Sequence, residues 1–516
     1  MRIRILLVVL MFLVSVVPFA SAAGIKNGAK CPVEGFIQTK GESTFRCVKS
    51  GKKLTWKKLE QKVIKYDVKQ IQSTDGGYLD NIIWGPCAKD PLLPKEWAEF
   101  EKFATSILGC AGQLRLAKYE LGLTRPTSKV DVASKFSDLS KCKIEIPNDR
   151  KGLSFATDAW RENRKSPGPN SVIQLIPIYS EDSTKPINSP EVDYGKYLNY
   201  MKEWIDYSSD FGSNVELRIP KEYFKFEHKI GDYLLYHKQN WDFEGHVRFN
   251  KDVVATVDAS IDFKGVDIAI VVAPPGTDAR IMQQAGIGPL KTDEGYVVNA
   301  FSEFADLPSK PMGSLYIILS HPFWWLHEAY HTGYGFDDHY GDNKRNINTE
   351  YGLGWWTMMT PFGGDLSIWE KWKIGFVRDS QFQCANPLET STHWIAPSSV
   401  RTQESKAVVI PINSTKVVVV ESIRSAGLHY KTPAENQGAL VYEIDFTQTE
   451  HGLGMKLALP NNRKIESTQF FLSDAPLRQG DYTTTNGLKI SVVEAGTFGD
   501  VIKVEKICEL NATFDQ

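Results

Sequence analysis

The pentapeptide His327-Glu328-Ala-Tyr-His331 constrains this chain more than any other stretch. It has the form His-Glu-x-x-His, and residues four apart on a helix lie on the same face. Both imidazoles can therefore reach a single ion, while Glu328 lies one residue along and can face a metal-bound water. Two neutral histidines that hold zinc, with a carboxylate that takes a proton from the activated water, are typical of a zinc hydrolase.

The residues around this motif predict where its helix begins and ends. Pro322 suits the first turn of a helix, where its missing N–H is not needed. The apolar run Leu315–Leu319 before it predicts a buried strand. Gly333 and Gly335 are expected to break the helix just past His331.

A third metal ligand is expected from the loop after this helix, which contains Asp337, Asp338 and His339. Three protein ligands plus a water make up the open coordination of a catalytic zinc site. The alternative is a helix with two hydrogen-bonded histidines and a glutamate on its surface.

The amino-acid composition limits which classes of protein this chain can belong to. The 516 residues are 42% hydrophobic and 24% charged, which suits a large core in more than one domain. The formal net charge of -2 argues against a nucleic-acid-binding protein.

The first residues have the pattern of a secretory signal peptide. Arg2 and Arg4 precede the apolar run Ile5–Phe19, and Ala20-Ser-Ala22 follows as a cleavage site of small residues. We therefore expect residues 1–23 to be removed and the mature chain to be secreted, extracellular or associated with the cell envelope. A membrane anchor is the alternative reading, although the apolar run is short for a span. No later segment is long and apolar enough to be a span.

Residues 24–58 are expected to form a small β module. Short alternating segments and glycine turns predict one or two hairpins. A Cys31–Cys47 disulfide would supply a constraint that so small a core lacks. The lysines of this module either contact an acidic cell-wall polymer or form a solvated basic face.

Residues 59–147 are expected to be a partly helical spacer, prosegment or cap. Apolar residues recur at helical spacing within Lys95–Tyr119. Of the seven cysteines in the chain, Cys87, Cys110 and Cys142 fall in this region, and a disulfide between two of these three is plausible.

Residues 148–378 are expected to form an α/β domain. Ser171–Tyr179 and Val215–Ile219 predict strands, and Val266–Ala273 predicts a strand that is buried on both faces. Between them, Tyr194–Ser208 predicts an amphipathic helix. A further helix is predicted in the second half of the stretch 361–376.

Residues 379–516 are expected to form an all-β, sandwich-like domain. Five apolar stretches separated by turns predict its strands: 407–412, 416–423, 438–445, 488–493 and 501–504. Cys384 and Cys508 bracket the domain and would join its two ends. Glu421 and Asp445, in or after its strands, could bind a calcium ion, or they form salt bridges.

The segment Ile318–Val377 resembles the immune inhibitor A type of secreted bacterial metallopeptidases, relatives of the metzincins. That family follows His-Glu-x-x-His with a Gly-x-x-Asp-x-Tyr loop, a Trp-x-x-Met turn and a helix that ends in Gly-Trp or Gly-Phe. The matching stretches here are Gly335-Phe-Asp-Asp338-His-Tyr340, Trp356-Thr-Met-Met359 and Ile368-Trp-Glu-Lys-Trp-Lys-Ile-Gly-Phe376. Downstream, Val418-Val-Val-Glu-Ser-Ile and Gly438-Ala-Leu-Val-Tyr-Glu-Ile-Asp445 are similar to two β segments of the family, so the resemblance covers roughly residues 150–505.

The resemblance implies a zinc ion held by His327, His331 and an aspartate, with Glu328 as general base. The family has a glycine three residues after the second histidine, where this chain has Tyr334, and Gly335 follows. Matching the loop signature makes Asp338 the third ligand, and we expect this residue because the signature includes Tyr340. Matching the distance from His327 makes it Asp337, which is the alternative. The aspartate that does not ligate, or His339, is expected to accept a hydrogen bond from a ligand histidine.

Further roles follow from the same resemblance. Tyr340 and Tyr351 are candidates for stabilising the oxyanion of the reaction, although either can be a packing residue. Met359 would form a hydrophobic floor beneath the metal.

The resemblance implies a metzincin-like α/β catalytic domain with a mixed sheet, followed by the β domain. The expected function is a zinc endopeptidase that hydrolyses extracellular proteins or peptides. The alternative is an inactive exported binding or surface protein with the same fold.

Overall fold

The computed structural model describes a set of residue ranges along the chain. These are residues 26–31, 37–40, 43–58, 124–145, 166–235, 242–282, 288–295, 297–302, 322–339, 352–354, 356–359, 365–424, 426–429, 432, 434–448, 452–466 and 472–507. The chain divides into two compact units, Met1–Gln61 and Lys62–Gln516. The predicted signal peptide, the predicted helix within Lys95–Tyr119 and the predicted strand at Leu315–Leu319 lie outside the described residues.

The first unit contains a three-stranded antiparallel sheet in the order β1-β2-β3. Its strands are β1 (Ile37–Lys40), β2 (Ser43–Ser50) and β3 (Lys53–Lys58). Lys30 pairs with Thr55, so a further stretch of chain runs beside β3. Trp56 and Cys31 are buried together, and Cys31 takes part in a disulfide. The side chain of Cys47 is outside the described ones, so its pairing with Cys31 stays a prediction.

The second unit opens with an α/β part built on a mixed sheet. Its strands are β4 (Val172–Tyr179), β5 (Glu216–Arg218), β6 (Phe224–Lys225), β7 (Ile268–Val272), β8 (Gly288–Lys291) and β9 (Val297–Ser302). The order is β5-β4-β7-β9-β8, with β6 beside the end of β4. Only β8 runs antiparallel to its neighbour among the pairs described in this sheet.

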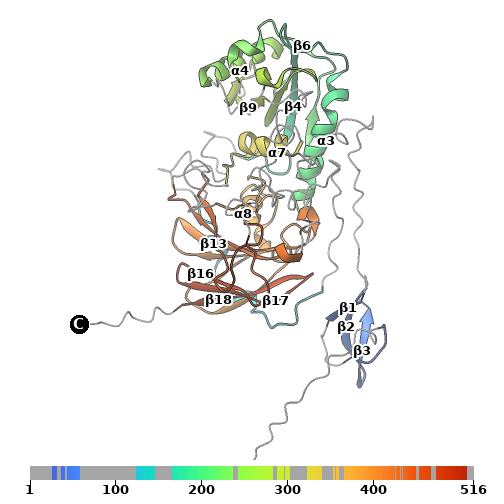
Figure 1. Ribbon diagram of the computed structural model, residues 1–516, viewed down its shortest axis with the longest axis vertical. Helices are drawn as coiled ribbons and strands as arrows, with labels where there is room; N and C mark the ends of the chain where they lie inside the picture. The colour runs from blue at the N-terminus through green and yellow to red at the C-terminus, as the bar shows by residue number, and fades with distance from the viewer. Residues whose placement is uncertain are drawn as a thin grey trace, which may run out of the picture. The chain divides into compact units, whose positions relative to one another are not determined.

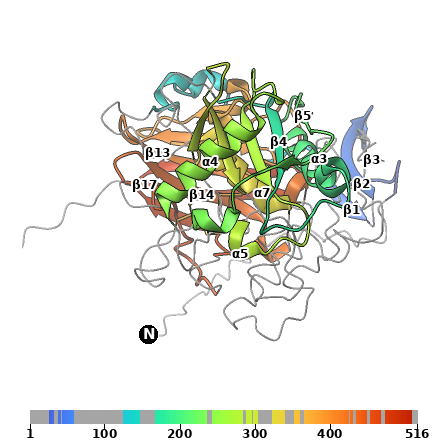
Figure 2. The same cartoon turned by 90° about the horizontal axis from the view of Figure 1, so that it is seen from above.

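Two helices cover the two faces of this sheet, α3 (Pro190–Ser208) and α4 (Phe243–Val257). Ile173 and Leu175 of β4 pack in the core that contains α3, whereas Ile176 and Ile178 pack in the core that contains α4. Strand side chains alternate between faces, so each face receives its own apolar set. Figure 1 shows β4 between the two helices, and Figure 2 shows the same layers from above. No helix among the described residues is long and apolar enough to cross a membrane.

The rest of the second unit is a β part of two sheets. One has the order β10-β12-β13-β14-β15 and the other β11-β18-β17-β16. The bounds are β10 (Phe382–Cys384), β11 (Ser391–Ile395), β12 (Ala407–Pro411), β13 (Lys416–Ile423), β14 (Gly438–Asp445), β15 (Met455–Leu457), β16 (Tyr482–Thr485), β17 (Leu488–Gly496) and β18 (Gly499–Lys506). Val418 and Val420 of the first sheet share a core with Ile490 and Ile502 of the second. The predicted combination of an α/β part and a β part is confirmed.

A single core joins the α/β part to the β part. It includes Ile173 and Trp325 on one side and Val409, Val419 and Tyr442 on the other. Between them lie α7 (Pro322–Ala329), the π-helical turn η9 (Tyr330–Tyr334) and α8 (Ile368–Lys373). Figure 1 shows α7 and α8 between the upper sheet and the sandwich. The remaining short elements are η4 (Ala133–Lys135), η5 (Leu139–Lys141), η8 (Ile230–Tyr233), α5 (Ala279–Met282), η10 (Asp379–Gln381), η11 (Gly427–His429) and η12 (Ala434–Asn436).

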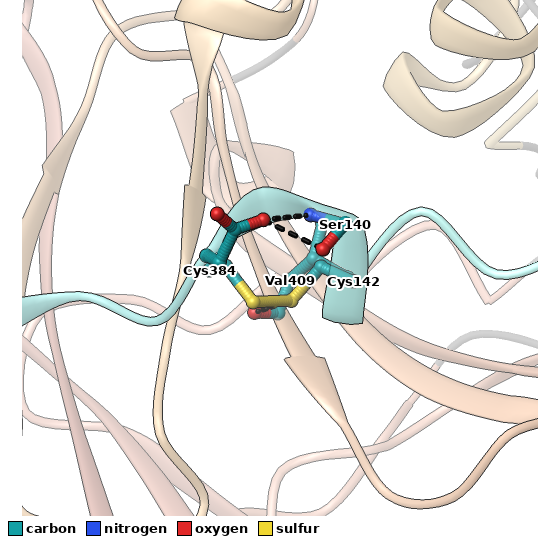
Figure 3. Close-up of a disulfide and its surroundings, with 5 residues drawn as sticks. Ser140, Cys142, Cys384 and Val409 are labelled. Atoms are coloured by element: carbon teal, nitrogen blue, oxygen red, sulfur yellow. Dashed lines mark hydrogen bonds between the residues drawn. A yellow bond between two sulfur atoms is a disulfide. The ribbon is translucent and has the colours of Figure 1, made fainter.

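The disulfide expected between Cys384 and Cys508 is wrong, because Cys384 bonds to Cys142 (Figure 3). The two Cα atoms lie 5.8 Å apart although the residues are 242 positions apart in sequence. The segment that contains Cys142 lies against the β part, where the N–H of Ser137 donates to the carbonyl of Cys384 at 2.8 Å. This bond also removes Cys142 from the predicted pairing with Cys87 or Cys110. Cys87, Cys110 and Cys508 are outside the described residues.

Candidate metal centre

The helix α7 is fixed by packing against α3. Trp325 is buried, and its ring stacks on Tyr197 at 4.7 Å and on Tyr194 at 5.6 Å between centroids. Offset aromatic stacking adds to the area that such large side chains bury. The helix begins at Pro322, as predicted, and its position fixes that of His327.

The helix does not end at Ala329. It continues as the π-helical turn η9, which ends at Tyr334. Gly335 follows in the left-handed region with φ 78°, and its N–H donates to the carbonyl of His331 at 3.1 Å. Gly333 lies so close to β7 that an added Cβ would be 2.5 Å from Ile268 Cδ1. A π turn contains more residues per turn than an α turn, so it accommodates one extra residue inside a helix. The π turn therefore accommodates the spacing between His331 and Gly335, which is one residue longer than the family resemblance implies. Asp338, in the loop that follows, still reaches the histidines.

Three side chains that can ligate a metal ion converge at α7, η9 and the loop that follows them. His327 Nε2 lies 3.0 Å from His331 Nε2, and both lie 3.3 Å from Asp338 Oδ1. Asp338, the aspartate expected from the loop signature, is the one that meets both histidines. His327, His331 and Asp338 could together hold a metal ion.

The spacing of these three atoms fits a small divalent ion. In a tetrahedral site with bonds of about 2.0–2.1 Å, neighbouring ligand atoms lie about 3.3 Å apart. The observed separations of 3.0 Å and 3.3 Å match this spacing, so the three residues could hold such an ion. The side chain of His327 is 2% exposed, whereas those of His331 and Asp338 are 12% and 16% exposed. Solvent therefore reaches the site from the side of His331 and Asp338.

Backbone carbonyls orient both imidazoles. His327 Nδ1 donates to the carbonyl of Met358 at 2.7 Å, and His331 Nδ1 donates to the carbonyl of Phe336 at 2.7 Å. The proton on each Nδ1 leaves Nε2 as the atom that faces the other ligands. The expectation that Asp337 or His339 takes this supporting role is wrong, since carbonyl oxygens fill it.

A proton and a metal ion compete for the same place in this site. Burial by itself disfavours a charged His331, but the Asp338 carboxylate outweighs burial and raises the pKa of His331 to about 10. The metal-free chain is therefore expected to hold this proton at pH 7, above the ordinary histidine pKa of about 6.5.

Metal affinity is consequently expected to rise with pH by about tenfold per unit between pH 6 and 8, because binding releases about one proton. The proton stabilises the metal-free fold fully below pH 6.5, and this contribution is lost as pH rises through about 10. Titration with Zn²⁺ in buffers of different ionisation enthalpy measures the protons released. An affinity that is flat over this range would contradict the assigned competition.

Glu328 is buried beside the three metal-binding side chains, with 6% of its surface exposed. Burial raises the pKa of its carboxyl, the charges of His331 and His327 lower it, and Asp338 raises it, so that the pKa lies above its usual value. A carboxylate whose pKa moves towards neutrality is better suited to accept and return a proton.

The loop that carries Asp338 is tied to the turn beneath the histidines. The N–H of His339 donates to the carbonyl of Met359 at 2.8 Å. The ring of His339 is buried, and its Nε2 lies 3.4 Å from Glu370 Oε1 of α8. Glu370 Oε2 also accepts from the hydroxyl of Thr357 at 2.5 Å. His339 thus contacts a buried carboxylate of α8. Met359 is fully buried, and its place beneath the metal stays a prediction.

Gly352 is a residue whose importance the sequence did not indicate. The N–H of the next residue, Leu353, donates to the carbonyl of His339 at 2.7 Å. A Cβ on Gly352 would overlap the carbonyl oxygens of His339 and Gly452. Its position in a Gly-Leu-Gly stretch after the ligand loop was the only signal.

Gly352→Ala is therefore expected to displace the loop that carries Asp338. Overpacking of this kind costs about 1–3 kcal/mol of stability, and we expect metal affinity to fall by at least about tenfold. Competition with a fluorescent zinc chelator measures the affinity, and thermal unfolding measures the stability. The matched control is Gly265→Ala, whose Cβ meets no neighbour although φ is +74°. Unchanged zinc affinity in Gly352→Ala would contradict the close approach.

Other sequence-predicted residues lie elsewhere. Tyr340 and Tyr351 are outside the described residues. Glu421 is buried and accepts from the hydroxyl of Tyr442 at 3.0 Å. Asp445 stands opposite Lys416, five ladder positions from Glu421, which is about 16 Å along a strand. Glu421 and Asp445 therefore cannot share one calcium ion.

Comparison with known proteins leaves the family open. No protein-family model matches the sequence, and no curated protein matches it. The resemblance to the immune inhibitor A type of metallopeptidases stays a prediction from motifs.

Proposed function

We propose that this protein is a zinc-dependent endopeptidase that cleaves extracellular proteins or peptides. The observation that carries the proposal is the convergence of His327 Nε2, His331 Nε2 and Asp338 Oδ1, with the buried Glu328 next to them. A non-catalytic zinc site needs no adjacent base and usually fills all four positions with protein ligands.

Two neutral imidazoles and one carboxylate are a donor set that zinc prefers. Zinc bound in this way acts as a Lewis acid and makes water a nucleophile near neutral pH. Ferrous iron in some oxygenases also uses two histidines and one carboxylate. The buried Glu328 favours zinc, because hydrolysis needs a proton acceptor at this place.

The residues of the chain would divide the work of hydrolysis among them. His327, His331 and Asp338 would hold the ion, and the carbonyls of Met358 and Phe336 would fix the rings. Glu328 would take a proton from the attacking water and return it to the leaving amine. The exposed side of His331 would face the substrate.

Action outside the cell is supported by the Cys142–Cys384 disulfide, since such bonds persist mainly in oxidising compartments. The predicted signal peptide points the same way. The disulfide and the predicted signal peptide together support an exported enzyme.

The decisive test combines metal analysis with hydrolysis of casein by the purified chain. We expect about one equivalent of zinc, activity that a chelator abolishes, and recovery on adding back zinc. Less than about a tenth of an equivalent after exposure to zinc would contradict the metal centre. Iron as the bound metal would point to redox chemistry.

Bound zinc without hydrolysis would favour the alternative of an inactive exported binding protein. A latent precursor gives the same result and is distinguished by removing the residues before 124, which keeps Cys142 and its disulfide to Cys384. Recovery of hydrolysis after that removal would restore the peptidase proposal, and its absence would overturn it.

A further inference from the structure

The first unit is far more basic than the rest of the chain. Residues 24–58 contain eight lysines, one arginine and two glutamates, whereas the whole chain has a formal net charge of -2. A concentration of one charge sign on a small unit attracts partners of the opposite charge. The arrangement of these lysines on the sheet indicates what kind of partner.

One face of the sheet carries a cluster of lysines. Lys53, Thr55 and Lys57 alternate along β3 and so lie on the same face. Lys30 pairs with Thr55 across the neighbouring bridge, which places it on that face as well. Arg46 stands opposite Lys57 in the register of β2 and β3. We call Lys30, Lys53 and Lys57 the lysine face, and all three side chains are exposed.

The opposite face of the sheet is closed by an apolar cluster. Trp56 is 2% exposed and packs with Cys31, Leu54 and Ala29. The backbone of Trp56 donates to the carbonyl of Ala29 at 2.7 Å, which holds the edge segment in place. The unit therefore has one face for its own stability and one face left to solvent.

The lysine face has no acidic partner within the described part of the unit. The described residues from 26 to 58 include no aspartate or glutamate, and none of the three lysines forms an ion pair there. Lys53 and Lys57 lie about 13 Å apart along the strand, and Lys30 lies about 7–8 Å from each across the ladder. Lys30 lies within about one screening length, about 8 Å at physiological salt, of each of the other two lysines. The like charges therefore repel one another, and an anion bound beside Lys30 would relieve this repulsion.

We propose that the lysine face binds an acidic polysaccharide, a polymer with a carboxylate on each repeating sugar. A row of ammonium groups on an open sheet matches a chain of regularly spaced anions better than a compact small molecule. Trp56, the one aromatic side chain described in this unit, is buried, so no described ring offers the stacking that single-stranded nucleic acids use. The described part of the unit also has no exposed large apolar side chain that would insert into a membrane.

The test uses the full chain and polygalacturonate as the probe, with neutral dextran as the control polymer. Binding is followed by affinity electrophoresis at 50 mM and 200 mM NaCl. We expect retardation by polygalacturonate alone, weakened by about tenfold or more at the higher salt. The variant Lys30→Gln/Lys53→Gln/Lys57→Gln is expected to bind at least about tenfold more weakly at 50 mM NaCl.

The matched control is Lys26→Gln/Lys49→Gln/Lys58→Gln, which removes the same charge. Lys49 pairs with Leu54, and Lys58 alternates with Trp56, so both lie on the other face. Lys26 lies before the turn at Asn27 and Gly28, outside the ladder that carries Lys30, Lys53 and Lys57. We expect this control to weaken binding by less than about threefold.

Equal losses in the two triple variants would overturn the assignment of the face, because net charge alone would then explain binding. No retardation by polygalacturonate would overturn the proposal outright. Tighter binding of single-stranded DNA than of polygalacturonate at equal charge would replace it with a nucleic-acid site. All variants leave the metal centre intact, so none of these outcomes depends on the proposed peptidase activity.

Discussion

Glu328→Gln is expected to lower the rate of peptide hydrolysis by about 10²–10⁴-fold while the chain still binds one zinc ion. Glutamine has nearly the same shape as glutamate, so the packing around this buried side chain is retained. It cannot accept a proton from water or return one to the leaving amine, and this transfer accounts for an effect of that size. Hydrolysis of a quenched fluorescent peptide, measured beside zinc content, separates the two functions.

The matched control is Glu191→Gln in the first turn of α3, which makes the same chemical change on an exposed helical residue. It is expected to retain full activity. Hydrolysis that survives in Glu328→Gln would show that another group is the base. Loss of zinc from the same variant would show that Glu328 shapes the metal centre rather than the reaction.

Replacing Cys142 and Cys384 together by serine is expected to cost about 2–5 kcal/mol of stability. The bond closes a loop of 242 residues, and loops of this length restrict the unfolded chain strongly. Both cysteines are buried, so two serine hydroxyls must also be accommodated inside the core. Thermal unfolding of the oxidised proteins measures the loss, and limited proteolysis shows whether residues 124–145 detach from the β part.

Reduction of the unaltered protein should lower its unfolding temperature as much as the double serine substitution does. Because reduction also opens the disulfide of Cys31, the variant Cys31→Ser is the control. It is expected to leave the unfolding of Lys62–Gln516 unchanged. A double variant as stable as the unaltered protein would mean that the hydrogen bonds of this segment suffice to hold it.

The sequence predicted the elements in which one local pattern dominates. Within the predicted strand Val266–Ala273, the residues of β7 are all apolar, and β7 is fully buried as that pattern requires. The helix α3 extends a few residues beyond the prediction because Ser189 accepts from the N–H of Val192 and Pro190 begins the first turn. Local rules of capping and burial were enough in both cases.

Elements that depend on distant partners were missed. The helix α4 was also missed, although Asp242 caps its first turn and Phe249, Val253 and Val257 recur at helical spacing. Strands β8 and β9 are short, and they form because β9 adds to the buried edge of β7.

Only part of the candidate metal centre could be predicted from local sequence patterns. Both histidines and Glu328 follow from a local motif, and the loop signature favoured Asp338. The π turn that precedes this loop has no signal in residue spacing alone. The carbonyls of Met358 and Phe336 carry no sequence signal, because every residue has a carbonyl.

The Cys142–Cys384 bond also limits how this protein can mature. A protease that cuts anywhere between residues 143 and 383 leaves two fragments that remain covalently linked under oxidising conditions. If the region before residue 148 is a removable inhibitor, a cut at that boundary would not release it. Release would require a cut on the N-terminal side of Cys142, and the residues between that cut and residue 148 would stay with the mature protein as a second chain or an extension.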